Sequence, residues 1–182
     1  MTPEEYLRFE RASKEKHEYF KGRVTALAGA SLGHNRIVGN LIRAVGNRLM
    51  GKPCEILPSD IRVKTPSGGS YMYPDAVIVC GKPELEDDQF DTLKNPMVIF
   101  EVLSPSTEDH DRGKKFSCYR QIPSFREYVL IDSTTSFVEV SRRQDDDSWK
   151  FESIADPDGA LFMESIRAHV PMQELYRNVF PG

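Results

Sequence analysis

The sequence predicts an α/β (α+β) fold in which helices flank a mixed β-sheet. Apolar residues recur at helical spacing through residues 34–50, whereas residues 97–103 form an apolar run that is typical of a central strand covered on both faces. Further strand-like segments lie between and after the predicted helices, and this order favours one sheet with helices around it. At 182 residues the chain fits a single domain over residues 1–182.

The N-terminal part of the chain contains two predicted helices with a hairpin between them. A charged helix is expected over residues 3–16, and Pro3 suits its first turn. Two short apolar runs within residues 17–28, separated by a Lys-Gly-Arg turn, predict a β-hairpin. The helical stripe of residues 34–50 gives the second helix.

Strands dominate the predictions for the rest of the chain. Residues 60–64 alternate in polarity and predict a half-buried strand with its polar residues on one face. Two more strands, over 72–79 and 97–103, flank an acidic stretch at 81–95 that we expect to be a solvated loop. The elements expected beyond them are a helix that begins near Asp109, strands over 126–132, 137–142 and 149–154, and a short helix around 172–177.

The net charge of −4 gives the chain no general attraction to nucleic acid. A nucleic-acid site would therefore need a local basic patch. The best candidate patch follows the helix expected over 34–50, and the alternative is an ordinary solvated helix face. Its members are Arg36, Arg43, Arg48 and Lys52.

Cysteine usage and hydropathy indicate a cytoplasmic protein without a membrane partner. Cys54, Cys80 and Cys118 are an odd number of widely spaced residues, which favours free thiols in a reducing compartment. The N-terminus is acidic and amphipathic, unlike a signal peptide. No apolar run approaches the roughly 20 residues that a membrane-spanning helix needs.

Two carboxylates in apolar strands form the centre of the candidate site. Asp75 lies within the strand expected over 72–79, and Glu101 lies within the strand expected over 97–103. A buried carboxylate is costly unless it is paired. If the two strands pair, both acids converge at one end of the sheet, and Mg²⁺ is usually held by one or two carboxylates together with water and phosphate. The alternative for either acid alone is an arginine partner or a turn cap.

A lysine on the following helix supplies a third member. Helical spacing places Lys115 on one face with Cys118 and Tyr119, whereas Lys114 lies about 100° around the axis. An inward lysine needs a carboxylate partner or a chemical role, such as orienting a water or stabilising a phosphoryl charge. The alternatives are a helix pair between Lys115 and Asp111, or a lysine that extends to solvent.

Taken together, these residues resemble a known nuclease pattern. Pro74-Asp75 followed by Glu101 and a lysine is similar to the PD-(D/E)XK motif, although Leu103 stands where that motif usually has its lysine. The Glu-Val-Leu-Ser-Pro-Ser-Thr block at 101–107, with Lys115 after it and the hairpin segment before it, resembles the Uma-two family of bacterial endonucleases. In that family the lysine lies on the following helix. The resemblance runs from about residue 5 to beyond residue 175.

The resemblance implies a restriction endonuclease-like fold and a Mg²⁺-dependent endonuclease that hydrolyses DNA phosphodiester bonds, with Mn²⁺ able to replace Mg²⁺. Asp75 and Glu101 would bind the metal, and Lys115 would position the attacking water. DNA is the expected partner, and a homodimer is compatible with this class of fold. The alternative is a catalytically silent nuclease-fold module that binds nucleic acid or serves in protein assembly, because the strand lysine is missing and the net charge is acidic.

Several polar residues outside this trio are secondary candidates. Glu18 is either a further acidic ligand or a surface charge of the hairpin. His34 either supports a metal ligand or phosphate, or is satisfied by backbone at a helix start. Asp60 either joins the acids from a neighbouring strand or pairs across the sheet. Ser104 and Ser106 are expected to cap the helix or shape the turn rather than act as nucleophiles.

Overall fold

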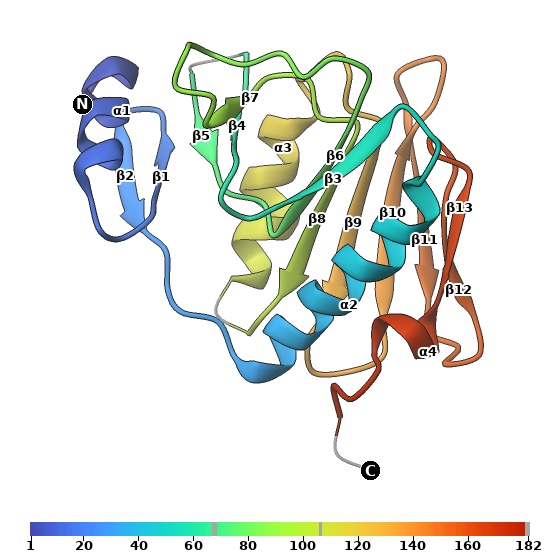
Figure 1. Ribbon diagram of the computed structural model, residues 1–182. Coiled ribbons are helices and arrows are strands. Elements are labelled where there is room, and N and C mark those ends of the chain that lie inside the picture. Colours follow the sequence, from blue (N-terminus) through green and yellow to red (C-terminus); the bar gives the residue numbers. More distant parts are fainter. Residues whose placement is uncertain (67–68, 106, 181–182) are drawn as a thin grey trace.

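The computed structural model describes residues 1–66, 69–105 and 107–180, and it confirms the predicted α+β architecture of mixed sheet and flanking helices (Figure 1). Its largest sheet has six strands in the order β11-β10-β9-β8-β6-β3, with β8 and β9 parallel and the other neighbours antiparallel. The strands are β3 (Cys54–Pro58), β6 (Ala76–Cys80), β8 (Val98–Leu103), β9 (Glu127–Asp132), β10 (Val138–Arg143) and β11 (Trp149–Ile154).

Helices cover both faces of the six-stranded sheet. α2 (Leu32–Leu49) packs on one face, where Val98, Phe100 and Val102 of β8 join its apolar stripe. On the other face Ile99 and Leu103 of β8 pack with the helical segment that follows the strand. The alternation of β8 side chains between two cores confirms the prediction of a central strand covered on both sides. No described helix is both long and apolar enough to cross a membrane.

The helix expected from Asp109 begins in an unusual form. It is a π-helix, η1 (His110–Lys115), that continues as the short α3 (Phe116–Tyr119). Single π-helical turns occur mostly inside helices and often at functional sites. The chain enters this segment through a turn in which Ser104 Oγ lies 3.1 Å from Thr107 Oγ1, in agreement with the role expected of Ser104. Ser106 lies outside the described residues.

A second sheet of five strands lies beside the N-terminal helix (Figure 1). α1 (Pro3–Ala12) has Thr2 and Glu5 in a capping box, with Pro3 in its first turn as predicted. Tyr6 of α1 stacks on Tyr19 at 5.1 Å between ring centroids and joins the helix to the predicted hairpin. The strands follow the order β2-β1-β5-β4-β7 and are β1 (His17–Phe20), β2 (Arg23–Ala26), β4 (Arg62–Lys64), β5 (Tyr71–Met72) and β7 (Thr92–Leu93).

The strand predicted over 72–79 is in fact two strands in two different sheets. β5 ends at Met72 and β6 begins at Ala76, so Tyr73-Pro74-Asp75 crosses from the five-stranded to the six-stranded sheet. Pro74 has no N–H for a ladder, which favours an interruption at this point. The crossing places Asp75 where the two sheets meet.

The C-terminal region adds a hairpin that periodicity did not predict. β12 (Ala160–Met163) pairs with β13 (Ala168–Pro171), and α4 (Met172–Leu175) follows and packs on α2. Buried Glu127 holds this hairpin against β9, because it accepts hydrogen bonds from Ser165 N–H at 2.8 Å and from Arg142 Nε at 3.2 Å.

The acidic stretch over 81–95 is largely an exposed loop, as predicted, but it ends in the buried strand β7, and several of its acids form ion pairs. Asp91 forms ion pairs with Arg11, at 2.9 Å, and with Arg62, while Glu86 pairs with Lys64 at 2.5 Å. Arg62 itself is buried, with a side chain only 3% exposed, whereas Asp60 is exposed, so the polar residues of the segment 60–64 do not share one environment. The acids of this stretch neutralise basic residues of the N-terminal sheet, and a single sequence does not reveal such distant partners.

The prediction of three free thiols is also wrong. Cys54 and Cys80 form a disulfide between β3 and β6, and Cys118 is the free cysteine. The two bonded residues are 26 apart in sequence but lie directly opposite in the antiparallel register. Sequence spacing alone did not show this proximity, because the β3 strand itself was not predicted.

Replacing Cys54 and Cys80 together by serine should lower the free energy of unfolding by about 3 kcal/mol, because the crosslink restricts the unfolded chain. Urea denaturation with and without a reductant measures the effect. The reductant should lower the midpoint of the wild-type protein and leave that of the double variant unchanged. An unchanged wild-type midpoint under reducing conditions would show that the crosslink does not stabilise the fold.

Candidate active site

A buried lysine surrounded by carboxylates is the most unusual feature of the molecule. The Nζ of Lys115 lies 3.0 Å from Glu18 Oε1, 3.1 Å from Glu101 Oε1 and 3.3 Å from Asp111 Oδ1. All four side chains are buried. Three ion pairs on one ammonium satisfy a charge that burial would otherwise make very costly.

Three separate elements deliver these side chains. Glu101 shares a face of β8 with Ile99 and Leu103, which belong to the same apolar cluster as Tyr119 of α3. Asp111 and Lys115 are four residues apart on η1 and face the same side. Glu18 comes from β1 in the other sheet, and its Oε1 also accepts the N–H of Tyr73 at 3.1 Å. The cluster therefore joins both sheets and the helical segment.

Asp75 stands next to Glu101 across the strand pair. The β6–β8 register pairs Ala76 with Phe100, so Asp75, directly before β6, lies opposite Glu101 of β8. Asp75 Oδ2 accepts the Val102 N–H at 2.7 Å, and its Oδ1 lies 3.1 Å from His34 Nε2. Its side chain keeps 20% exposure, which makes it the acid of the group with most access to solvent.

The charges of this acidic cluster, defined as Glu18, Asp75, Glu101, Asp111 and Lys115, do not balance. The cluster contains four carboxylates and one ammonium, which contacts three of them. Burial raises the pKa of Glu101 well above its ordinary value, and the charges of Asp111 and Asp75 raise it further against the opposing effect of Lys115. Burial likewise raises the pKa of Asp111. The cluster thus retains protons on its acids or takes up another cation.

Lys115 and Glu18 stay charged within this cluster. Burial alone would lower the pKa of Lys115, but the negative charges of Glu101, Glu18 and Asp111 raise it well above its ordinary value. For Glu18 burial acts to raise the pKa, and the charge of Lys115 with the hydrogen bonds of His110, Lys115 and Tyr73 lowers it. This ion pair is the fixed part of the cluster.

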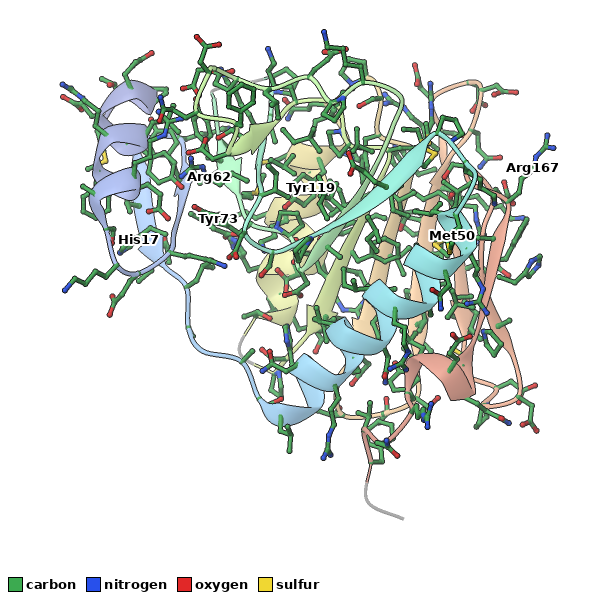
Figure 2. All side chains as sticks on the ribbon, viewed as in Figure 1. His17, Met50, Arg62, Tyr73, Tyr119 and Arg167 are labelled. Carbon is green, nitrogen blue, oxygen red and sulfur yellow. A yellow bond between two sulfur atoms is a disulfide. The ribbon has the colours of Figure 1, made fainter. Side chains whose placement is uncertain are left out.

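Polar side chains orient the acids from their outer sides. Tyr119, labelled in Figure 2, donates its hydroxyl to Glu101 Oε1 at 3.2 Å. His110 Nε2 lies 3.2 Å from Glu18 Oε2, and His34 contacts Asp75 as described above. The second ring nitrogen of His34, Nδ1, is buried and has no hydrogen-bond partner among the described residues. His110 and His34 thus lie at opposite ends of the cluster, one beside Glu18 and the other beside Asp75.

The donor set suits a small hard cation held in an open manner. Mg²⁺ prefers oxygen ligands and is usually bound by one or two carboxylates that leave room for water and phosphate. Glu101 of β8 and Asp75, which directly precedes the neighbouring strand β6, provide such a pair. Within the described residues no group of three or more His, Cys, Asp or Glu side chains is arranged so that it could hold a metal ion. The two-carboxylate mode is therefore the one that this chain fits.

The structure gathers five of the six predicted site residues and separates the sixth. Asp60 lies in a turn with a side chain 84% exposed and pairs with Lys16, so it is not part of the cluster. Asp111 and His110 belong to the cluster or its border, yet neither was predicted as a site residue. The helical stripe that contains Asp111 and Lys115 was the signal for Asp111; the contact of His110 with Glu18 depends on tertiary structure.

The predicted basic patch on α2 has mainly structural contacts. Arg48 pairs with Glu174 of α4 at 2.7 Å, Lys52 donates to the carbonyl oxygen of Ile166 at 2.6 Å, and Arg43 donates to Asn40 Oδ1 at 3.0 Å. Two of these basic residues attach the C-terminal region to α2, which makes a nucleic-acid role for the set unnecessary.

Replacing Lys115 by methionine should lower the free energy of unfolding by about 3–5 kcal/mol at neutral pH, because it leaves buried carboxylates unpaired. Glu101 and Asp111 then bind protons more tightly in the folded variant than in its unfolded chain. The variant should therefore lose further stability as the pH rises above the ordinary pKa of these acids, 4.5 for Glu101 and 3.8 for Asp111. Urea denaturation in EDTA at several pH values tests this. Lys114→Met, at an exposed neighbouring position, is the control, and equal effects of both substitutions would contradict the account.

Comparisons with known proteins agree with this architecture. The family described as "Putative restriction endonuclease" (Uma2) matches residues 3–168. Two uncharacterized proteins of Synechocystis are similar: slr1290 is 35% identical over 98% of this chain and 93% of its own length, and sll1609 is 37% identical over 82% and 84%.

A solved structure shows the same fold. The crystal structure described as "a putative nuclease belonging to DUF820" from Anabaena variabilis has a TM-score of 0.81 to this chain, covers 99% of both chains and is 18% identical. At this identity the likeness concerns the fold alone. The resemblance drawn from the sequence is confirmed: the chain belongs to the Uma2 family and has a restriction endonuclease-like fold.

Proposed function

We propose that this protein is a metal-dependent endonuclease that hydrolyses phosphodiester bonds of DNA. The observation that carries the proposal is the excess of carboxylates over cations in the acidic cluster, which includes a buried ammonium in contact with three of them. A purely structural cluster would reach neutrality with fewer acids, because each unpaired buried carboxylate costs free energy. With all four acids ionised and Lys115 charged, the cluster has three negative charges in excess, and a divalent cation would offset two of them.

Asp75 and Glu101 are the residues that would hold Mg²⁺, with Mn²⁺ as a substitute, and Glu18 is positioned to assist them. When bound, the ion supplies charge stabilisation to the attacking and leaving oxygens of an in-line displacement. His34 and the Val102 N–H fix the two oxygens of Asp75. Tyr119 and Lys115 fix those of Glu101. Such outer contacts orient ligand oxygens before a ligand arrives.

Lys115 acts through charge rather than proton transfer in this proposal. Its raised pKa keeps the ammonium protonated at neutral pH, so it is suited to hold an attacking water and to stabilise negative charge that develops on phosphate. Its place on η1 rather than at position 103 of β8 changes the element that delivers the lysine. Nζ still lies 3.1 Å from Glu101 Oε1, which is the contact that the function requires.

One observation favours a second candidate, a catalytically silent module that binds nucleic acid. Lys115 Nζ is fully engaged by three carboxylates, and the described residues contain no metal cage of three or more ligands. Under this alternative, the ammonium is the permanent cation of the cluster. Binding of DNA without cleavage in any divalent metal would favour the silent module.

Cleavage of supercoiled and linear DNA in Mg²⁺ or Mn²⁺ tests the proposed activity. Glu101→Gln should lower the rate by at least about 100-fold, since loss of a group that stabilises transition-state charge has an effect of this size. Asp60→Asn is a matched control because it removes an exposed acid outside the cluster, and it should keep wild-type activity. Cleavage that both variants retain would trace the activity to a contaminant or to another site.

Metal binding should release a proton. The pKa of Glu101 is raised, so between its ordinary value of 4.5 and that raised value the folded protein carries a proton that a cation must displace. Affinity for Mg²⁺ should therefore increase with pH through this window. Calorimetric titration at several pH values upward from 4.5, in two buffers of different ionisation enthalpy, should give different observed heats within this window, and Glu101→Gln should remove the difference. Identical heats for the wild-type protein would contradict the assignment.

A further inference from the structure

A small pocket lies directly beside the acidic cluster. It has a volume of about 120 Å³ and opens between the β1–β2 hairpin and η1. Glu18 and His110 line both the pocket and the border of the cluster. The remaining lining residues are Phe20, Arg23, Thr25, Met72 and Lys114.

The rim of this pocket carries two basic side chains that form no ion pair with the described part of the chain. Arg23 and Lys114 are exposed, and neither forms an ion pair within the described residues. By contrast, Arg62, Arg112 and Arg142 are all held by carboxylates. Lys114 Nζ lies 5.0 Å from the ring centroid of Phe20, which directs its charge over the pocket floor. His110, with a side chain 41% exposed, adds a third basic group.

Glu18 does not cancel this positive rim. Its carboxylate already has Lys115 Nζ at 3.0 Å and His110 Nε2 at 3.2 Å as partners. The pocket lining therefore contains two cations without an ion pair among the described residues and a partly exposed histidine. Its one carboxylate, Glu18, is neutralised by the buried Lys115. Such a combination attracts an anion.

The size of the pocket limits which anion enters. Sites for drug-sized ligands usually measure about 300–1,000 Å³, so a pocket of about 120 Å³ holds a group of a few atoms rather than a nucleoside. A phosphate group has that size, carries the required charge and accepts hydrogen bonds from arginine, lysine and threonine side chains.

We propose that the pocket formed by Arg23, Lys114 and His110 binds a phosphate of the nucleic-acid backbone, next along the strand from the phosphate that would be cleaved. This inference rests on the proposed function, which makes the neighbouring acidic cluster the site of cleavage. The pocket sets the register of the strand, because a phosphate fixed beside Glu18 determines which phosphodiester bond reaches Asp75 and Glu101. Arg23 and Lys114 are thus positioning residues.

Binding to a fluorescein-labelled DNA duplex in EDTA, measured by anisotropy over a range of NaCl concentrations, tests the inference without any cleavage. The double variant Arg23→Gln/Lys114→Gln should bind about tenfold more weakly, and the slope of log K against log salt should shrink by about one, the loss of one phosphate contact. The control Lys150→Gln/Arg167→Gln removes the same charge at exposed positions. It should match the wild-type protein, because β11 and Arg167 lie on the far side of the molecule from His17 and β1 (Figures 1 and 2).

Titration with inorganic phosphate, followed by NMR of the backbone amides of Arg23, Thr25 and Lys114, distinguishes a backbone site from a site for free phosphate. Shifts that saturate, and that the duplex competes away, support the proposal. Phosphate binding combined with unchanged DNA affinity in the double variant would overturn it in favour of free phosphate. Equal losses in the pocket and control variants, or no DNA binding by the wild-type protein, would also overturn it. If only the pocket variant loses DNA affinity and the wild-type protein never cleaves DNA, the phosphate site stands and the proposed nuclease activity is contradicted.

Discussion

The buried ammonium of Lys115 is the interaction on which the rest of the structure depends. It connects Glu18 of the five-stranded sheet, Glu101 of the six-stranded sheet and Asp111 of η1, with separations of 3.0–3.3 Å. Without it, three acids from three elements would repel one another in a region of low dielectric. The position of the N-terminal sheet against the central sheet is thus partly electrostatic, in addition to the apolar cluster in which Val63 and Met72 of the five-stranded sheet join Ile99 of β8.

The charges around this ammonium also explain why the site lowers the stability of the fold. The three carboxylates around Lys115, with Asp75 beside Glu101, leave a surplus of negative charge that apolar residues of similar volume would avoid. The surplus falls where Tyr73-Pro74-Asp75 crosses between sheets and where a π-helical turn interrupts regular structure. Departures from regular structure that coincide with unbalanced charge are typical of functional sites. The phosphate pocket inferred beside Glu18 extends this pattern to the surface.

Local patterns in the sequence predicted the parts of the site that a single element determines. The helical phase of residues 109–122 indicated an inward Lys115 and an outward Lys114, and the structure confirms that orientation: the first is buried and the second exposed. Alternation identified β8 and the face of Glu101. The catalytic roles of Asp75, Glu101 and Lys115 stay predictions.

Features that depend on contacts between distant segments were beyond the sequence. The Cys54–Cys80 crosslink requires the β3–β6 register, and the ion pairs of Asp91 require α1 and β4 to meet the loop before β7. Asp60 was placed wrongly because a turn residue next to a strand has the same alternation as the strand itself. Asp111 entered the sequence analysis only as a possible helix partner of Lys115, and His110 was missed because its contact with Glu18 joins η1 to a distant strand.

The central claim is that the acidic cluster holds a divalent cation beside Lys115. A crystal of the protein soaked in Mn²⁺ and measured at an anomalous wavelength tests it most directly. The account predicts one anomalous peak with carboxylate oxygens of Asp75 and Glu101 at about 2.1 Å, a distance typical of a small octahedral cation. Lys115 Nζ should remain against Glu101. A cluster that stays free of Mn²⁺, with Lys115 still paired to all three acids, would contradict the claim.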